Sequence, residues 1–363
     1  MVINSLPQYL SDPQLISNVL KIFGLGAIAF IGGILVTPAL TNFLYRHKLW
    51  KKAVRDKAID GKTLVVFTKF HKEREVSVPR FGGLLVWTIP LGLAAIFVIL
   101  SRTHISLFEK LDFFSRSQTW LPFFALVTGA LIGLLDDFLQ TRGAGKYIGG
   151  GLSLKTRLFV MFMIGLVAGL WFYFKLDWRT LHIPGLGDIW IGILYIPLFI
   201  IAMLGTYSGG VIDGIDGLAG GTFATAFAAF GAIAFFGGQV DLAAFCTVIV
   251  GAILAFLWFN IPPARFYMGE TGTMGLCAAL TVVAFLSDSV LVLPVIAMLL
   301  VLEAASVIIQ LLSKKFLKRK VFLASPLHHH FEAKGWPNYK ITMRFWVIGV
   351  IVAIIGVAIK LLG

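Results

Sequence analysis

Residues 121–139 read LPFFALVTGALIGLLDDFL, an apolar run that closes on the adjacent carboxylates of Asp136 and Asp137. A helix needs about 20 apolar residues to cross a bilayer, so this run predicts a membrane span. Charge at the edge of a span is costly and by default marks a functional site. Two neighbouring carboxylates also raise each other's pKa unless a cation or hydrogen-bond donors lie close by. The pair therefore predicts a site with a cationic partner at one end of a membrane helix.

The whole chain has the composition of a polytopic membrane protein. Of its 363 residues, 58% are hydrophobic and only 13% are charged, and its mean hydropathy of +0.89 lies outside the range of soluble domains. We predict an all-α protein of about ten transmembrane helices, with residues 1–363 forming one integral membrane domain. The predicted spans are Val19–Leu44, Gly82–Ser101, Leu121–Leu139, Thr156–Phe174, Ile189–Thr206, Leu218–Phe236, Leu242–Asn260, Gly272–Leu286, Ser289–Leu312 and Thr342–Leu362.

The basic residues gather in alternate loops between these spans. Five such loops carry 24 of the 31 Lys and Arg residues. Because basic loops stay in the cytoplasm, we expect these five to be cytoplasmic and both termini to be extracytoplasmic. The net charge of +13 then reflects orientation and contact with anionic lipid, and we expect no nucleic-acid partner. Residues 1–18 lack the basic segment and cleavage site of a signal peptide, so the first span should be retained.

Further acids lie in the loops predicted to be cytoplasmic. Asp213 and Asp216 occur in the sequence SGGVIDGIDGL (208–218). Their three-residue spacing places both on one face of a helical turn, and the glycines permit close approach by a ligand. Glu270 lies in the segment NIPPARFYMGETG (260–272), with an aromatic ring nearby that could stack on a planar base. We interpret both segments as parts of one site.

Four other features stand out. Arg80 lies in PRFGG (79–83), where proline and two glycines favour a tight turn at the mouth of a span. The glycine-rich, basic segment 140–157 suits phosphate. Three consecutive histidines, 328–330, cannot all face one ligand from a helix, so we expect one or two to be functional. Glu303 is an acid inside a predicted span, and we expect it to find a partner in the protein interior, with a structural hydrogen bond as its first role.

The predicted topology puts these acids and histidines on one side of the membrane. Carboxylates among basic residues and glycine-rich turns match the needs of phosphoryl transfer, which are a divalent metal, charge compensation and positioning. Mg²⁺ is the expected metal because the candidate ligands are hard oxygens. Asp136 and Asp137 would point about 100° apart on a helix. We therefore expect them to divide roles, one toward the metal and the other toward the nucleophile or a lysine.

Together these motifs resemble the polyprenyl-phosphate N-acetylhexosamine-1-phosphate transferases. The resemblance rests on the Asp136-Asp137 pair, on DGIDGL (213–218), on residues 260–272 and on PLHHHFE (326–332). It spans nearly the whole chain. The histidine motif, with Gly-Trp and Arg-Phe-Trp downstream, is similar to the branch that acts in peptidoglycan synthesis, as is EAASVIIQ (303–310).

The resemblance implies ten transmembrane helices in a bacterial inner membrane, with both ends extracytoplasmic and a cytoplasmic active site. It implies that undecaprenyl phosphate attacks the β-phosphate of UDP-N-acetylmuramoyl-pentapeptide in the presence of Mg²⁺, giving lipid I and UMP. Membrane lipid is a further partner, and a homodimer is left open. The implied residues are Asp136, Asp137 and His328 for catalysis, Glu270 for the metal, and Asp213, Asp216, Asn260, Tyr267, Gly269, Arg80, His329 and His330 for substrate, with Asp216, Asn260 and Tyr267 toward the uridine.

The chain departs from the family pattern at Glu75, Arg80, Gly210 and Glu270. Pro-Arg at 79–80 is more similar to the branch that uses UDP-N-acetylglucosamine, which makes that nucleotide sugar an alternative substrate. Direct attack and a two-step route through an aspartyl intermediate are both open. A transporter or lipid-binding scaffold is the alternative from another class. Transporters place charge at the bilayer midplane and have two similar halves, whereas most acids here are predicted at one face and no repeat is visible.

Overall fold

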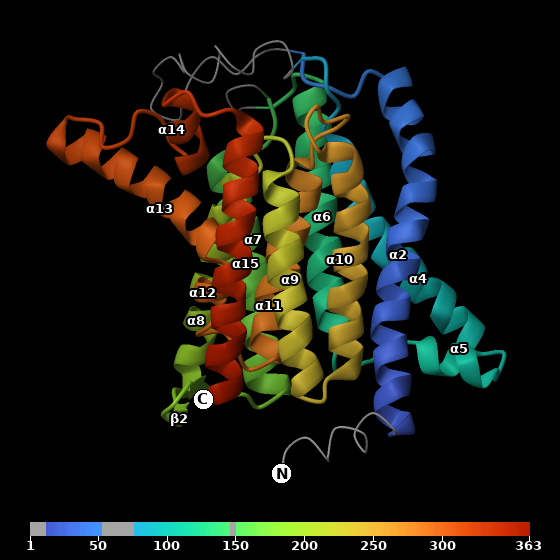
Figure 1. The fold of residues 1–363 in the computed structure, drawn as a ribbon. Helices are drawn as coiled ribbons and strands as arrows, with labels where there is room; N and C mark the ends of the chain where they lie inside the picture. The colour runs from blue at the N-terminus through green and yellow to red at the C-terminus, as the bar shows by residue number, and fades with distance from the viewer. Residues whose placement is uncertain (1–11, 53–75, 146–149) are drawn as a thin grey trace.

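The computed structural model describes residues 12–52, 76–145 and 150–363, and most of these residues are helical (Figure 1). Three sets of expectations fall wholly or partly outside the described residues. They concern the expectation that residues 1–18 are not a signal peptide, most of the first basic loop including Glu75, and residues 146–149 within the glycine-rich segment.

Within the described residues, nine helices are long and apolar enough to cross a membrane. The prediction of an all-α polytopic membrane protein is confirmed. The helices are α2 (Pro13–Arg46), η1 (Phe81–Gly83), α4 (Leu84–Ser101), α5 (Ser106–Leu111), α6 (Trp120–Thr141), α7 (Leu154–Leu170), η2 (Trp171–Lys175), η3 (Gly192–Leu194), α8 (Tyr195–Ser208), η4 (Gly209–Ile212), α9 (Leu218–Phe236), α10 (Val240–Asn260), α11 (Gly269–Leu286), α12 (Leu293–Ile296), α13 (Met298–Leu312), η5 (Ser313–Leu317), α14 (Leu327–Ala333) and α15 (Asn338–Leu362). Strands β1 (Thr180–Ile183) and β2 (Gly187–Trp190) form an antiparallel hairpin.

The predicted span Ser289–Leu312 is divided into two helices. The break between α12 and α13 lies at Ala297, whose φ of −96° and ψ of 28° depart from helical values. Because that residue interrupts the helix, α13 changes direction and leaves the bundle obliquely (Figure 1). Glu303 on α13 pairs with His328 on α14.

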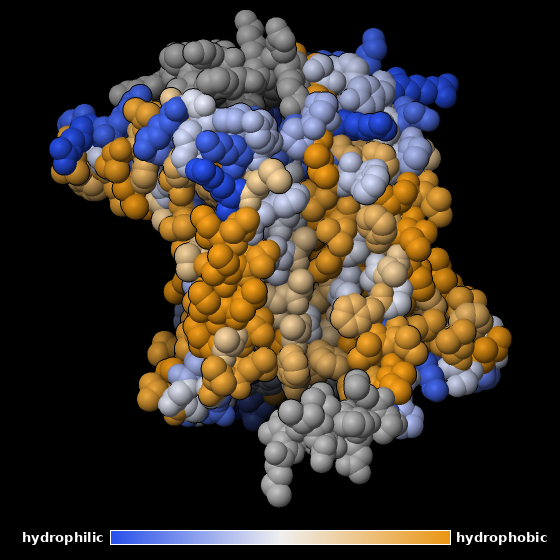
Figure 2. All heavy atoms as spheres, viewed as in Figure 1, coloured by the Kyte–Doolittle hydropathy of each residue, from blue (hydrophilic) through white to orange (hydrophobic). Residues whose placement is uncertain are grey.

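The two ends of the bundle differ in what they carry. Helix α2 begins, and α15 ends, at the end that also holds the β hairpin, here called the hairpin end (Figure 1). The opposite end, where α6 ends and α11 begins, holds the candidate residues and is here called the site end. Hydrophobic residues cover the middle of the molecule between these ends, and hydrophilic residues gather toward them (Figure 2). This pattern fits a helical bundle that crosses a bilayer.

Helix α11 forms the centre of the bundle, and 94% of its span is buried. It packs closely along α6 because glycines replace larger side chains at the contact. A methyl group at Gly133 would lie 2.1 Å from the carbonyl oxygen of Glu270, and one at Gly129 would lie 2.8 Å from that of Met274. The close approach sets the end of α6, which carries two candidate acids, directly against the first turn of α11.

We expect Gly133→Ala to lower the free energy of unfolding by about 1–3 kcal/mol, because the added methyl overpacks two backbones that cannot separate easily. Thermal unfolding of the purified protein in detergent measures the effect. Gly32→Ala is the matched control, since nothing lies within 4 Å of the added methyl in α2. There the better helix propensity of alanine should leave stability unchanged or raise it by up to about 1 kcal/mol. Equal melting temperatures for the two variants would contradict the close α6–α11 contact.

Candidate functional site

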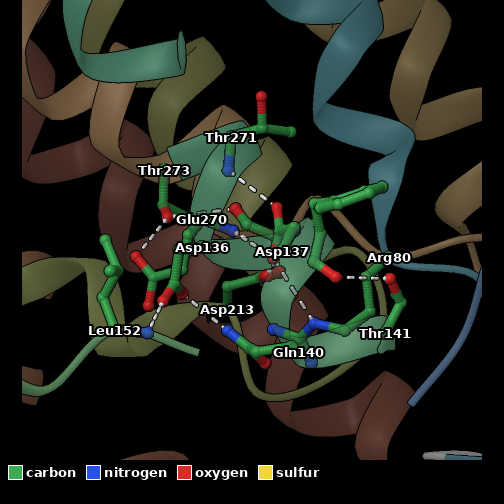
Figure 3. Close-up of polar contacts among 12 residues, drawn as sticks. Arg80, Asp136, Asp137, Gln140, Thr141, Leu152, Asp213, Glu270, Thr271 and Thr273 are labelled. Carbon is green, nitrogen blue, oxygen red and sulfur yellow. Dashed lines mark hydrogen bonds and ion pairs between the residues drawn. The ribbon is translucent and has the colours of Figure 1, made fainter. Parts of the chain in front are cut away.

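Four carboxylates converge at the site end (Figure 3). Asp136 and Asp137 lie near the end of α6 and are fully buried. Asp213 directly follows η4. Glu270 lies in the first turn of α11 and is partly exposed. Elements that are distant in the sequence therefore bring together four acids that the sequence analysis had assigned to one site.

Asp137 binds the beginning of α11. Its two carboxylate oxygens accept the backbone N–H groups of Glu270 at 3.1 Å and Thr271 at 2.9 Å. The first N–H groups of a helix have no partner within the helix, so this carboxylate satisfies two of them and complements the helix dipole. The Arg80 Nε lies 3.7 Å from the same side chain. Asp137 therefore holds Glu270 in place, and Arg80 supplies a nearby positive charge.

Asp136 faces a different set of donors. It accepts the Gln140 side-chain amide at 2.6 Å and the backbone N–H of Leu152. The Arg157 guanidinium lies 3.9 Å from this carboxylate and forms a close ion pair with Glu270. The two adjacent aspartates thus point to different partners, as their 100° separation on a helix predicts.

The Oε1 atom of Glu270 pairs with Arg157, whereas its other carboxylate oxygen, Oε2, has only weak partners. Its Oε2 lies 3.5 Å from the hydroxyl groups of Tyr207 and Thr273, which makes both contacts weak hydrogen bonds. Gly269, one residue earlier, has a φ of +72°. A methyl group there would lie 2.4 Å from the carbonyl oxygen of Arg80 and 2.5 Å from an Asp137 oxygen. Only glycine fits this position, because the backbone must turn left-handed between two site residues.

Asp213 completes the group by accepting the backbone N–H of Gly269 at 3.1 Å. Burial raises the pKa of the Asp213 carboxyl to about 6, although the positive charge of Arg80 opposes the shift. Four carboxylates and two guanidinium groups leave a formal charge of −2 when all are ionised. Burial of excess negative charge favours a bound cation.

The donor set fits a divalent metal of the Mg²⁺ type. The carboxylates are hard oxygen ligands, and each offers about four acceptor positions, more than the hydrogen bonds named above use. Glu270, Asp136 and Asp213 are the residues that could hold such an ion. Their oxygens are not gathered into one compact cluster, because Arg157 stands between Glu270 and Asp136.

One compact group of ligand atoms lies at the hairpin end instead. Among the described residues, only His182, Asp188 and Asp288 form a set of at least three such side chains whose ligand atoms all lie within 4.8 Å of one another. His182 and Asp188 are opposite each other in the hairpin, and their side chains are 2.8 Å apart. His182 therefore has two acidic neighbours. Its hydrogen bond with Asp188 accounts for its position.

A second set of predicted residues is held in the protein interior. Asn260 accepts the backbone N–H of Gly217 at 2.9 Å and donates to the carbonyl of Phe266 at 2.7 Å. Asp216 accepts the N–H of Ala264 at 3.1 Å. The side chains of Asn260 and Asp216 are buried, so they link the loop after η4 to the segment before α11. Tyr267 forms backbone hydrogen bonds to Pro79 and Gly82, next to Arg80.

The three histidines have three different environments. His328 is fully buried and pairs with Glu303 at 3.1 Å, which confirms that Glu303 finds a partner in the interior. His329 pairs closely with Glu332. His330 is less buried, and its Nδ1 accepts the backbone N–H of Leu323 at 3.1 Å. Burial and the charge of Lys334 lower its pKa.

Known proteins resemble this chain over most of its length. A model of glycosyl transferase family 4 matches residues 119–288. The phospho-N-acetylmuramoyl-pentapeptide-transferase of a Geobacillus species is 32% identical over 339 residues, which cover 92% of this chain and 96% of that protein. The enzyme of the same name from Chloroflexus aurantiacus is 32% identical over 96% of this chain and 92% of its own length. The one from Chlorobium phaeobacteroides is 36% identical over 77% and 79%. The chain belongs to this transferase family.

Membership in the phospho-N-acetylmuramoyl-pentapeptide-transferase family confirms the resemblance seen in the motifs. The range matched by the family model contains all four converging carboxylates, together with Asp216 and Asn260. Arg80 and the histidines 328–330 lie outside that range. Arg80, just before η1, lies beside Asp137, and His328 of α14 lies against Gly214 next to Asp213.

Sequence reasoning missed several residues of this transferase site. Arg157 was included in the basic segment 140–157 as a group that suits phosphate, although it lies in the first turn of α7 and pairs with Glu270. Its position one residue inside a predicted span was the available signal, since a cation there needs a partner. Gln140, four residues after Asp136, was detectable by helical spacing. Nothing in the sequence pointed to Tyr207 or Thr273.

Proposed function

We propose that the protein transfers phospho-N-acetylmuramoyl-pentapeptide from its UDP conjugate to undecaprenyl phosphate, at the cytoplasmic face of a bacterial inner membrane. An oxygen of the lipid phosphate would attack the β-phosphorus of the nucleotide sugar. The bond from that phosphorus to UMP would break, giving lipid I and UMP. The observation that carries this proposal is the convergence of Asp136, Asp137, Asp213 and Glu270 with Arg157 and Arg80, in a chain aligned with transferases of this name over 92% of its length.

A bound Mg²⁺ would neutralise the phosphate charge and polarise the β-phosphorus. Glu270, with Asp136 and Asp213, is our proposed ligand set. Asp137 would act by holding the first turn of α11 so that Glu270 faces the substrate. Arg157 would compensate phosphate charge from its place beside Glu270.

The lipid nucleophile needs little help with its proton. A phosphate monoester has a second pKa of about 6, so it is mostly dianionic at neutral pH. Positioning and charge compensation are therefore larger contributions than general base catalysis. We propose that Asp136 orients the lipid phosphate through the donors that surround it, which include the Gln140 amide and the Arg157 guanidinium.

UMP release from two nucleotide sugars tests the proposal. The purified protein in detergent, with undecaprenyl phosphate and Mg²⁺, should release UMP from UDP-N-acetylmuramoyl-pentapeptide and much less from UDP-N-acetylglucosamine. The second sugar is the alternative substrate because Pro-Arg at 79–80 is more similar to the branch that uses it, and Arg80 Nε lies 3.7 Å from Asp137. The reverse preference would overturn the assignment to peptidoglycan synthesis, but the protein would still be a phospho-sugar transferase. Counterflow in proteoliposomes without UMP release would indicate a transporter.

The raised pKa of Asp213 predicts a pH dependence of metal binding. Below about pH 6 its carboxyl is protonated in the substrate-free protein, so a cation must displace a proton, whereas above pH 6 it is already charged. Mn²⁺ affinity measured by electron paramagnetic resonance without substrate should fall by up to about tenfold per pH unit below pH 6. Asp213→Asn should bind more weakly at neutral pH and show a flatter profile. If Mn²⁺ affinity depended on pH in the same way in the parent and in Asp213→Asn, Asp213 would be excluded as a metal ligand.

A further inference from the structure

Glu303 and His328 form a buried pair beside the proposed site. Both side chains are fully buried. The Glu303 carboxylate accepts the backbone N–H of His328 at 3.2 Å and lies 3.1 Å from its Nδ1. A carboxylate only accepts hydrogen bonds, so the proton of this contact is on Nδ1. Two contacts from one carboxylate thus fix both the position and the tautomer of one histidine.

The other ring nitrogen of His328 faces a loop of the proposed site. Its Nε2 is buried without a hydrogen-bond partner in the described part of the chain. A methyl group at Gly214 would lie 2.1 Å from this nitrogen and 2.8 Å from Cε1. The imidazole therefore occupies the space over Gly214 that any other residue would need. Gly214 lies between Asp213 and Asp216, the two acids of that loop.

The neighbouring acids also affect the protonation of His328. Burial alone would lower the pKa of His328, but the neighbouring carboxylate of Glu303 outweighs burial and raises it, with Glu332 and Asp213 acting in the same direction. The direction of this shift also shows that Asp213 lies within electrostatic reach of the imidazole. A buried Glu–His pair contributes little net stability because desolvation is costly. Retaining one here is better explained by positioning.

We propose that Glu303 is a positioning residue for the nucleotide half of the site, acting through His328 on the Asp213–Asp216 loop, a role that rests on the proposed function. Glu303 holds the imidazole against Gly214, and the imidazole sets the position of the loop backbone. In that position Asp213 accepts the backbone N–H of Gly269 and Asp216 accepts that of Ala264, both in the segment 260–272. His328 in this arrangement acts on the loop rather than on the reacting phosphates.

The experiment compares Glu303→Gln with the parent protein in kinetics and in binding. Gln keeps the size of the side chain and an acceptor for the His328 N–H, but it removes the charge that fixes the imidazole. The KM for the nucleotide sugar should rise about tenfold while the KM for undecaprenyl phosphate changes less than about twofold. UDP affinity, measured by calorimetry without turnover, should weaken by about the same factor. Glu303→Asp keeps the charge, so its KM for the nucleotide sugar and its UDP affinity should lie between those of the parent and of Glu303→Gln.

Ser306→Ala is the matched control on α13. Ser306 is buried, and its hydroxyl donates to the backbone carbonyl of Glu303 within the same helix. Its removal perturbs the helix without touching the histidine, so both KM values and UDP affinity should be unchanged. If Glu303 served only folding, Glu303→Gln would lower the melting temperature and leave the ratio of the two KM values as in the parent.

Gly214→Ala changes the contact between His328 and the loop, because it adds a methyl group at the position where the imidazole packs. It should weaken UDP binding, and combining it with Glu303→Gln should add little, because both variants displace the same imidazole. Unchanged UDP affinity in Glu303→Gln, with a parent protein that binds UDP and releases UMP, would overturn the positioning role alone. A parent protein that binds no UDP would overturn the proposed function and the positioning role together.

Discussion

Asp136→Asn is expected to reduce UMP release by about 1000-fold while the protein remains folded. The amide keeps the shape of the side chain but removes a fully buried negative charge. It also places an NH₂ group among donors, since the carboxylate accepts from Gln140 and from the N–H of Leu152. Steady-state release of UMP, with the melting temperature recorded alongside, measures the effect.

The control for this variant lies at the other end of the bundle. Asp241→Asn removes a part-buried acid that pairs with Lys21 at 2.6 Å, in the first turn of α10. Its activity should stay within about twofold of the parent, because this ion pair is far from the acid cluster and contributes little to stability. Asp137→Asn should also lose activity, through displacement of the first turn of α11. Full activity in both Asp136→Asn and Asp137→Asn would refute the proposed transferase site.

Glu270→Gln is expected to lower kcat/KM by about 100-fold and to raise the Mg²⁺ concentration needed for half-maximal activity. The substitution removes the proposed metal ligand and leaves the Arg157 guanidinium without its closest carboxylate. Arg157 would then turn to Asp136, whose nearest oxygen lies only 3.9 Å away. The variant therefore loses a ligand and gains a competing cation at the site. A Mg²⁺ titration of UMP release separates these losses from a change in substrate affinity.

Glu270→Asp is the matched variant, because it keeps the charge and shortens the side chain by one methylene. It should retain activity within about tenfold of the parent, since its backbone N–H still binds Asp137 and only the reach toward the metal changes. Glu270→Gln with the kcat/KM of the parent would exclude Glu270 from the metal site. Equal losses in both variants would indicate that the length of the arm matters as much as its charge.

Much of the architecture could be predicted because the bilayer restricts what an apolar run can do. Continuous runs such as residues 121–139 have to form helices that satisfy their own backbone hydrogen bonds, and the structure contains the expected helix there, α6. The division of the predicted span Ser289–Leu312 could not be read in the same way. The residues on both sides of Ala297 are apolar, so hydropathy does not reveal the change of direction.

The four acids and Arg80 were assigned to one site from the sequence, whereas Arg157 was missed. Carboxylates at the ends of apolar runs are easy to recognise in a sequence. Placing a charge at the edge of a membrane span costs free energy, so such a residue indicates a functional site. Arg157 and Arg80 were harder to interpret, because basic residues in such loops also serve orientation and contact with lipid. Which arginine pairs with which acid depends on how α7 and η1 pack against α11, and that packing has no local signal in the sequence.

Local composition and spacing are enough to predict the membrane class, the family motifs and the acids Asp136 and Asp137 at the end of the run 121–139. The contacts that these acids make depend on tertiary packing. It assigned Asp137 to the first turn of α11, Asp136 to Gln140 and Leu152, and Glu303 to His328. The physical reason is that a buried polar group takes its partner from whichever element packs against it. At this site those elements are separated by as many as 134 residues of chain.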